Sequence, residues 1–136
     1  GLVVYWLLVF PGTLEPLIIH SVFGILAFCA IPICGKAEII LDKEDPNEVV
    51  LDEFVAQPLV FIGIQWISPT HLFDTHALLV LACGFALFRF FDILKPLGIG
   101  RLQRIPGGTG VVADDIAAAL AAGLLLWLIF RNLPIS

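Results

Sequence analysis

The stretch GGTGVVADDIAAALAAGLLLWLIF, residues 107–130, decides the fold of this chain, because it combines a membrane-length apolar run with acids near its start. Residues 111–130 are apolar except for Asp114 and Asp115. This run reaches the roughly 20 residues that a spanning helix needs. Its alanines and Gly123 recur at helical spacing, which permits close contact between helices. We therefore predict a membrane helix that carries two carboxylates near one membrane face.

Similar apolar runs precede it at residues 2–10, 17–33, 49–67 and 75–94. The first is too short to span, and the others approach spanning length. The whole chain is 60% apolar and 14% charged, whereas soluble domains carry about a quarter charged residues. We predict an all-α, polytopic membrane helix bundle of about four to five helices, in a single domain over residues 1–136. Because the chain begins with Gly1 and contains no methionine, we expect that N-terminal residues are missing.

The basic residues indicate how the runs are oriented. Four connections join the apolar runs, at residues 11–16, 34–48, 68–74 and 95–110. The second connection carries Lys36 and Lys43, and the fourth carries Lys95, Arg101 and Arg104. The first and third connections carry no Lys or Arg. By the positive-inside rule, the second and fourth connections face the cytoplasm. The net charge of −5 argues against a nucleic-acid partner, which would need a basic surface.

This topology gathers the charged residues at one membrane face. An ionisable residue inside a helix end is costly unless it is paired, hydrated or metal-bound. Several carboxylates close together repel one another, and Mg²⁺ removes that conflict because it prefers oxygen ligands. The alternative is a network of ion pairs that only anchors helix ends. The gathered residues are Glu38, Asp42, Asp45, Glu48, Asp52, Glu53, Arg89, Asp92, Asp114 and Asp115.

Two segments have a spacing suited to a phosphate group. In FRFFDILKP, residues 88–96, Arg89, Asp92 and Lys95 lie along one side of a helix. They offer one anionic ligand between two cations that bind phosphate. In GGTG, residues 107–110, the glycines let backbone N–H groups approach an anion ahead of a helix. We predict phosphate binding by Arg89, Lys95, Gly108 and Thr109.

The segments LDEFVAQ (51–57), FRFFDILKP (88–96) and GGTGVVADD (107–115), in this order, resemble the phosphatidylglycerophosphatase A family, as does GKAE at 35–38. The resemblance implies a Mg²⁺-dependent phosphatase that converts phosphatidylglycerophosphate to phosphatidylglycerol at the cytoplasmic side of the bacterial inner membrane. The family's acidic motif falls on Asp52 and Glu53, and Glu38 matches a position that is often acidic or polar. Two departures are Ala56 and Gly98, where the family has a glycine and a proline.

These inferences assign roles to the charged residues. We predict that Asp52, Glu53, Asp92 and Asp115 are catalytic, with either Asp115 or Glu53 as general base. Direct attack by water and a phospho-aspartyl intermediate both remain open. The predicted Mg²⁺ ligands are Asp52, Glu53, Asp92, Asp114, Asp115 and Glu38.

Three alternatives stand beside this function. A non-catalytic membrane subunit of the same fold would keep the helices for assembly. A small ion transporter would need polar residues through the bilayer centre, and residues 117–129 contain none. A soluble helical relative would bury its apolar faces in an oligomer. A membrane homo-oligomer is also possible, and a related lipid monophosphate would need the same polar groups.

Overall fold

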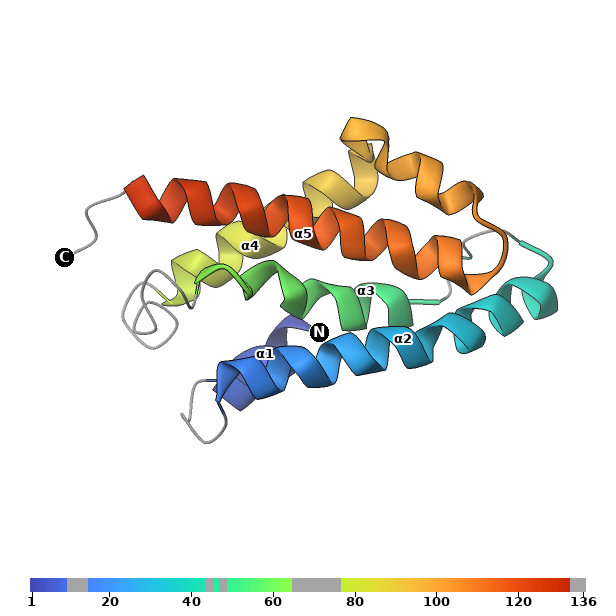
Figure 1. The fold of residues 1–136 in the computed structure, drawn as a ribbon, viewed down its shortest axis with the longest axis horizontal. Helices are drawn as coiled ribbons and strands as arrows, with labels where there is room; N and C mark the ends of the chain where they lie inside the picture. The colour runs from blue at the N-terminus through green and yellow to red at the C-terminus, as the bar shows by residue number, and fades with distance from the viewer. Residues whose placement is uncertain (10–14, 44–45, 47–48, 65–76, 133–136) are drawn as a thin grey trace.

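The structure is a computed structural model that describes residues 1–9, 15–43, 46, 49–64 and 77–132. Within these ranges the regular structure is helical, without strands (Figure 1). The elements in chain order are α1 (Leu2–Val9), α2 (Pro16–Leu41), α3 (Leu51–Ala56), the 3₁₀ helix η1 (Gln57–Phe61), α4 (Ala77–Leu94), the 3₁₀ helix η4 (Pro96–Arg104) and α5 (Gly108–Asn132).

Three of these helices are long and apolar enough to cross a membrane, namely Leu17–Leu41, Ala77–Leu94 and Gly108–Arg131. Many of their large apolar side chains point outward, and Phe28 and Leu124 are 75% and 61% exposed. In water such exposure costs roughly 25 cal/mol per Å², whereas lipid solvates these side chains. The chain is therefore a membrane protein, and the soluble alternative is disfavoured.

The predicted all-α bundle is confirmed, but the run at 49–67 forms no additional spanning helix among the described residues. Its described part contains α3 and η1, which together occupy residues 51–61. Every residue from Val55 to Phe61 is buried, with α2, α4 and α5 packed around this segment. Its apolar composition fills the interior of the bundle, as expected of a helix that is apolar on all sides.

Proline has different effects in the two helical segments that contain it, η1 and α2. The α-helical turn tightens to a 3₁₀ helix next to Pro58, which has no N–H to donate. By contrast, α2 continues through Pro32 to Leu41. The exposed position of Pro32 leaves its ring pointing away from the other helices.

Polar side chains tie the buried α3–η1 segment to its neighbours. His20 Nε2 lies 3.2 Å from the Pro58 carbonyl oxygen. Because a carbonyl oxygen only accepts, this nitrogen carries the proton. Gln57 Oε1 accepts a hydrogen bond of 3.0 Å from the N–H of Leu2. Such bonds matter inside a membrane protein, where water cannot satisfy backbone groups.

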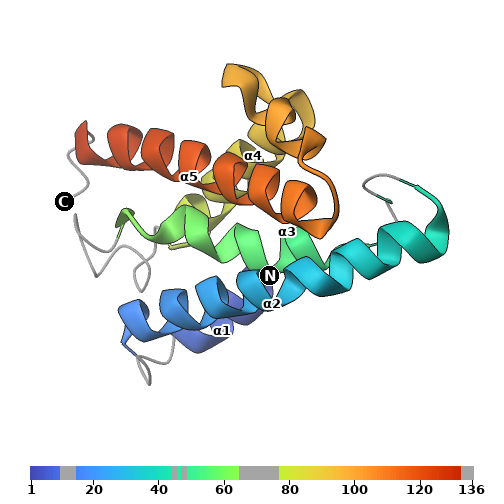
Figure 2. The same ribbon diagram turned by 45° about the vertical axis from the view of Figure 1, so that its right-hand side comes forward.

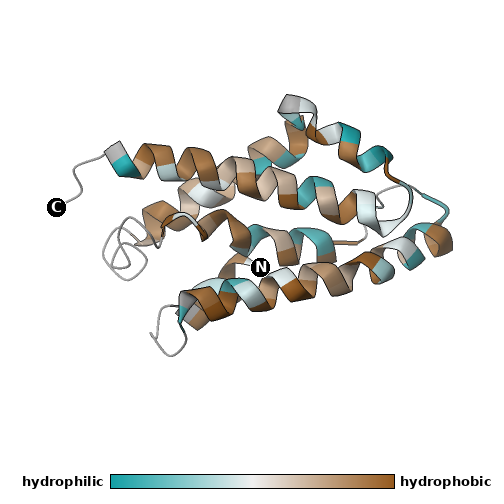
Figure 3. Ribbon diagram, in the orientation of Figure 1, coloured by the Kyte–Doolittle hydropathy of each residue, from teal (hydrophilic) through white to brown (hydrophobic). Residues whose placement is uncertain are grey.

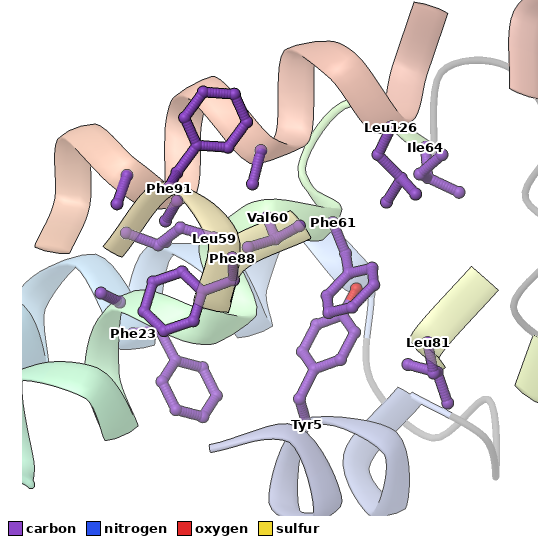
Figure 4. Packing of buried hydrophobic residues seen from close by; sticks show 14 of the residues in the cluster. Tyr5, Phe23, Leu59, Val60, Phe61, Ile64, Leu81, Phe88, Phe91 and Leu126 are labelled. Carbon is purple, nitrogen blue, oxygen red and sulfur yellow. The ribbon is translucent and has the colours of Figure 1, made fainter. Parts of the chain in front are cut away.

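Close contacts hold the core around η1 (Figure 4). Tyr5 stacks on Phe61, with ring centroids 5.1 Å apart. On the other side of η1, small residues of α5 allow backbone contact. A Cβ on Gly123 would lie 2.7 Å from the carbonyl oxygen of Val60, so only glycine fits without displacement.

The helix directions bring distant parts of the sequence together. Figures 1 and 2 show that α2 and α4 run one way along the bundle, whereas α3–η1 and α5 run the other way. The ends of α2 and α4 therefore lie at the same end of the bundle as the starts of α3 and α5, together with η4. Hydrophilic residues gather at this end (Figure 3).

We predict that Gly123→Ala destabilises the protein, because the added methyl group must displace the η1 backbone at Val60. Overpacking of this kind costs about 1–3 kcal/mol. The matched control is Gly24→Ala on α2, whose Cβ would meet nothing within 4 Å. Thermal unfolding in detergent should show a lower Tm for Gly123→Ala only. Equal Tm values for the two variants would contradict the proposed contact.

Candidate active site

Most of the predicted site residues lie on or directly beside three helices, α3, α4 and α5, which meet at the hydrophilic end of the bundle (Figure 3). Asp52 and Glu53 lie in the first turn of α3. Arg89 and Asp92 lie in the last two turns of α4, and Asp115 lies in the second turn of α5. The antiparallel directions of these helices therefore bring residues 52, 92 and 115 to one level.

A pocket of about 360 Å³ lies where these helices meet. Its floor is acidic, because Asp52 and Asp115 are buried and the Asp92 side chain is only 14% exposed. Glu53 and Arg89 are partly exposed and form its rim. The pocket is lined by Val49, Asp52, Glu53, Arg89, Asp92, Ile93, Lys95 and Asp115.

Arg89 links two of the helices across the rim. Its Nη1 lies 2.9 Å from Glu53 Oε2 on α3 and 3.1 Å from Asp92 Oδ2 on its own helix. This arrangement places a guanidinium group between a rim acid and a floor acid. An incoming phosphate could bind to the same guanidinium, which suits planar oxyanions.

Lys95 connects the pocket to the buried Asp114. It follows the last residue of α4 and adopts a left-handed conformation with φ of 43°, immediately before Pro96. Its Nζ forms an ion pair with Asp114 Oδ2, and the Asp114 side chain is 1% exposed. Asp114 and Asp115 therefore point in different directions, since adjacent helical residues lie about 100° apart. Asp114 forms the ion pair with Lys95, and Asp115 lines the pocket.

Asp115 carries a buried oxygen whose charge needs a counterpart. Its Oδ2 has no hydrogen-bond partner among the residues that the structure describes. Asp92 lies within hydrogen-bonding reach of Asp115, and Asp52 also acts on it electrostatically. Buried carboxylates so close together need a proton or a cation between them. The pocket floor is therefore suited to a positively charged ligand.

The donor set fits a hard divalent cation such as Mg²⁺, which prefers carboxylate oxygens and water. Within the described ranges, no three His, Cys, Asp or Glu side chains are already arranged around one ion position. The fit therefore rests on the kind of donors and on the unsatisfied Asp115 oxygen. The carboxylates that line the pocket are Asp52, Glu53, Asp92 and Asp115.

Four predicted site residues are absent from the lining of this pocket. Asp114 forms the ion pair with Lys95, and its predicted role as a metal ligand stays a prediction. Glu38 lines a separate cavity of about 650 Å³, between the end of α2 and the turn before α5. Gly108 packs against α2, where a Cβ would collide with the carbonyl oxygen of Ile31. Thr109 is exposed at the start of α5. Metal binding by Glu38 and phosphate binding by Gly108 and Thr109 stay predictions.

The sequence analysis overlooked two apolar residues that line the pocket. Val49 precedes α3, and Ile93 follows Asp92 on α4. Both belong to apolar runs, so their composition gave no reason to separate them from lipid-facing residues. The available signal was helical spacing, because Ile93 lies one turn beyond Arg89 and shares its face.

The fold and the pocket define a helical membrane protein with a carboxylate-rich site at one end of the bundle. A family model described as Phosphatidylglycerophosphatase A matches residues 1–130. The chain belongs to this family.

Comparison with curated proteins finds relatives in several bacteria. A Haemophilus influenzae protein named Phosphatidylglycerophosphatase A is 32% identical to this chain, and the match covers 87% of this chain and 73% of that protein. An Escherichia coli protein with the same name is 27% identical, and the match covers 97% of this chain and 71% of that protein. A Bacteroides thetaiotaomicron protein named "Putative phosphatidylinositol-3-phosphatase" is 39% identical over 61% of this chain, but the match spans only 48% of that protein. No solved structure shows a significant match.

We predict that Lys95→Met destabilises the protein by about 3 kcal/mol, because the buried carboxylate of Asp114 loses its cation. The double variant Lys95→Met with Asp114→Asn should recover most of this loss. Reversible unfolding in mixed detergent micelles measures both effects as a double-mutant cycle. A double variant as unstable as the single one would show that the ion pair is not the cause.

Proposed function

We propose that the chain is a Mg²⁺-dependent phosphatase that hydrolyses phosphatidylglycerophosphate to phosphatidylglycerol and phosphate, as a step in phospholipid synthesis. One observation carries the proposal: Asp52, Asp92 and Asp115 share a pocket with Arg89 and Lys95. Family membership and the names of the two relatives that match most of the chain support the choice of substrate.

The carboxylates of Asp52, Asp92 and Asp115 would hold Mg²⁺, with Glu53 available at the rim. When bound, the ion would neutralise negative charge on the phosphoryl oxygens and lower the pKa of a water molecule. Asp114 has a different part in this scheme, because its ion pair with Lys95 positions the Lys95 ammonium group.

The side chains of the rim and floor would then perform the proton and charge transfers. Arg89 donates hydrogen bonds to the phosphate and compensates the charge that moves to the leaving oxygen. Lys95 adds a second positive charge at the opposite side of Asp92 along α4. Either Asp115 or Glu53 accepts the proton of the attacking water. A phospho-aspartyl intermediate is the alternative path, since the same carboxylates could attack phosphorus.

The orientation in the membrane follows from the basic residues near the pocket. Lys36 and Lys43 lie at the end of α2 and beside it, and Arg101 and Arg104 belong to η4 at the same end of the bundle. We infer a multi-pass protein in the bacterial inner membrane whose active site faces the cytoplasm.

The Bacteroides relative suggests a second candidate substrate, a phosphoinositide. Its phosphate is also a monoester at the membrane surface, so the same pocket residues would serve it. The two substrates differ in the headgroup that carries the phosphate. Parallel assays with phosphatidylglycerophosphate and phosphatidylinositol 3-phosphate therefore separate the two functions.

We predict that purified protein releases phosphate from phosphatidylglycerophosphate with Mg²⁺ but not with EDTA. Asp92→Asn should lower kcat/KM by at least about a hundredfold, since it removes a charged group from the pocket floor. Asp42→Asn is the matched control, because Asp42 lies at the same end but outside the pocket, and asparagine tolerates its left-handed conformation. Absence of release by the wild type would favour the non-catalytic subunit.

A second prediction concerns metal binding apart from turnover. In EDTA, Asp115→Asn should raise the Tm because it removes one of the crowded pocket acids, whose buried oxygen has no hydrogen-bond partner among the described residues. Saturating Mg²⁺ should stabilise the wild type by about 2–3 kcal/mol at a hundredfold excess over Kd, and Asp115→Asn by much less. Asp42→Asn should respond as the wild type does. Equal stabilisation of Asp115→Asn and wild type would exclude Asp115 as a metal ligand.

A further inference from the structure

The α3 helix begins without a cap from its own N-cap residue. That residue is Val50, and its side chain forms no capping hydrogen bond, since a hydrocarbon group has no acceptor atom. The first hydrogen bond along the helix backbone joins the N–H of Phe54 to the carbonyl oxygen of Val50, at 3.0 Å. The N–H of Asp52 comes earlier in the first turn, where a helix offers no backbone partner. It therefore needs an acceptor from another part of the chain.

Cys34 of α2 provides this acceptor. The backbone N–H of Asp52 donates a hydrogen bond to the Cys34 sulfur. Sulfur is a weak acceptor, but Cys34 is only 1% exposed, so water does not compete for the same N–H. An unpaired N–H would be costly at such a buried position. The Cys34 side chain thus takes the place that Ser, Thr, Asp or Asn usually fills at an N-cap, although it comes from a different helix.

Packing from three helices fixes the position of the Cys34 side chain. It belongs to one cluster of buried side chains with Ala30 of its own helix, Val55 of α3 and Val112 of α5. The backbone of α5 also comes close, since a Cβ on Gly108 would lie 3.1 Å from the Cys34 Cβ. Cys34 therefore lies where α2, α3 and α5 meet, and its sulfur has little freedom to move away from α3.

The hydrogen bond bears on the acidic pocket because it holds the backbone of a floor acid. Asp52 lines the pocket and is 4% exposed. Its Oδ1 has no hydrogen-bond partner among the residues that the structure describes. The next residue, Glu53, has its carboxylate tied to Arg89 of α4. The backbone of the first turn therefore helps to set where the Asp52 carboxylate lies relative to Asp92 and Asp115.

We propose that Cys34 is a positioning residue for the phosphatase site, because its sulfur caps α3 from α2 and so holds Asp52 beside Asp92 and Asp115. This inference rests on the proposed function and adds α2 to the helices that build the site. Cys34 acts through Asp52 alone, since none of the α2 residues lines the pocket. The role needs an acceptor atom and not a thiol, so a hydroxyl group at this position should serve it.

The first test examines the hydrogen bond itself, without turnover. In protein labelled with ¹⁵N-aspartate and held in detergent micelles, the Asp52 amide proton should exchange with D₂O about fivefold faster in Cys34→Ala than in the wild type. Cys34→Ser keeps an acceptor and should exchange nearly as slowly as the wild type. Cys29→Ala is the matched control, because it removes an exposed thiol from the same helix. Equal exchange of the Asp52 amide in Cys34→Ala and wild type would overturn the proposal.

The second test separates positioning from packing by the order of the two variants. A side chain that only fills space would tolerate Cys34→Ala better than Cys34→Ser, since serine buries a hydroxyl group. Positioning predicts the reverse order. With phosphatidylglycerophosphate and Mg²⁺, kcat should fall about tenfold in Cys34→Ala, while KM changes little because Arg89 and Lys95 are retained. Cys34→Ser should recover at least half of the wild-type kcat.

The stabilisation of each variant by Mg²⁺, measured as the rise in Tm over EDTA, should follow the same order as kcat. A Cys34→Ser protein as impaired as Cys34→Ala in kcat and in this rise would overturn the positioning role. If Asp52 exchange follows the predicted order but the wild type releases no phosphate from phosphatidylglycerophosphate, the proposed function is refuted and the cap on α3 stands.

Discussion

A short helical segment enclosed by longer helices is the constraint on which this structure depends. Residues 55–61 are buried, so their side chains do not reach lipid and their backbone groups must find partners inside the protein. The His20 ring donates a hydrogen bond to the Pro58 carbonyl oxygen, and the Gln57 side-chain oxygen accepts one from the N–H of Leu2. The absence of a side chain at Gly123 lets α5 approach η1 closely. With the segment fixed in this way, the first turn of α3 holds Asp52 and Glu53 opposite α4.

The charges at the end of the bundle form two linked systems with different burial. Arg89 joins Glu53 and Asp92 at the partly exposed rim, where water remains available to the ions. Lys95 and Asp114 form the inner pair, in which the carboxylate is almost fully buried. Between these systems lies Asp115, with an oxygen that has no hydrogen bond from a described residue. The ion pairs around it explain how several acids can share a small pocket. Under the proposed function, the cation would bind beside the Asp115 oxygen.

The convergence of the described charged residues could be predicted from the sequence, because the order of the runs and the placement of basic residues define which helix ends meet. Asp45 and Glu48, predicted to join them, lie outside the described residues. The length of α3–η1 could not be predicted from the sequence, since a run buried in protein and a run facing lipid have the same apolar composition. The separate directions of the Asp114 and Asp115 side chains could not be predicted either, because they depend on the rotation of α5 about its axis. Gly108 shows the same ambiguity: glycine suits both an anion-binding turn and a close helix contact, and the structure places it against Ile31.

The enclosed position of α3–η1 also bears on how the protein is made. As folded, the segment of helical residues 51–61 is too short to cross a bilayer on its own. Its favourable surroundings exist only after α4 and α5, which follow it in the chain, have entered the membrane. Biogenesis therefore places the assembly of the acidic pocket after the synthesis of the last helix, so that a ribosome-bound chain lacking α5 has no assembled site.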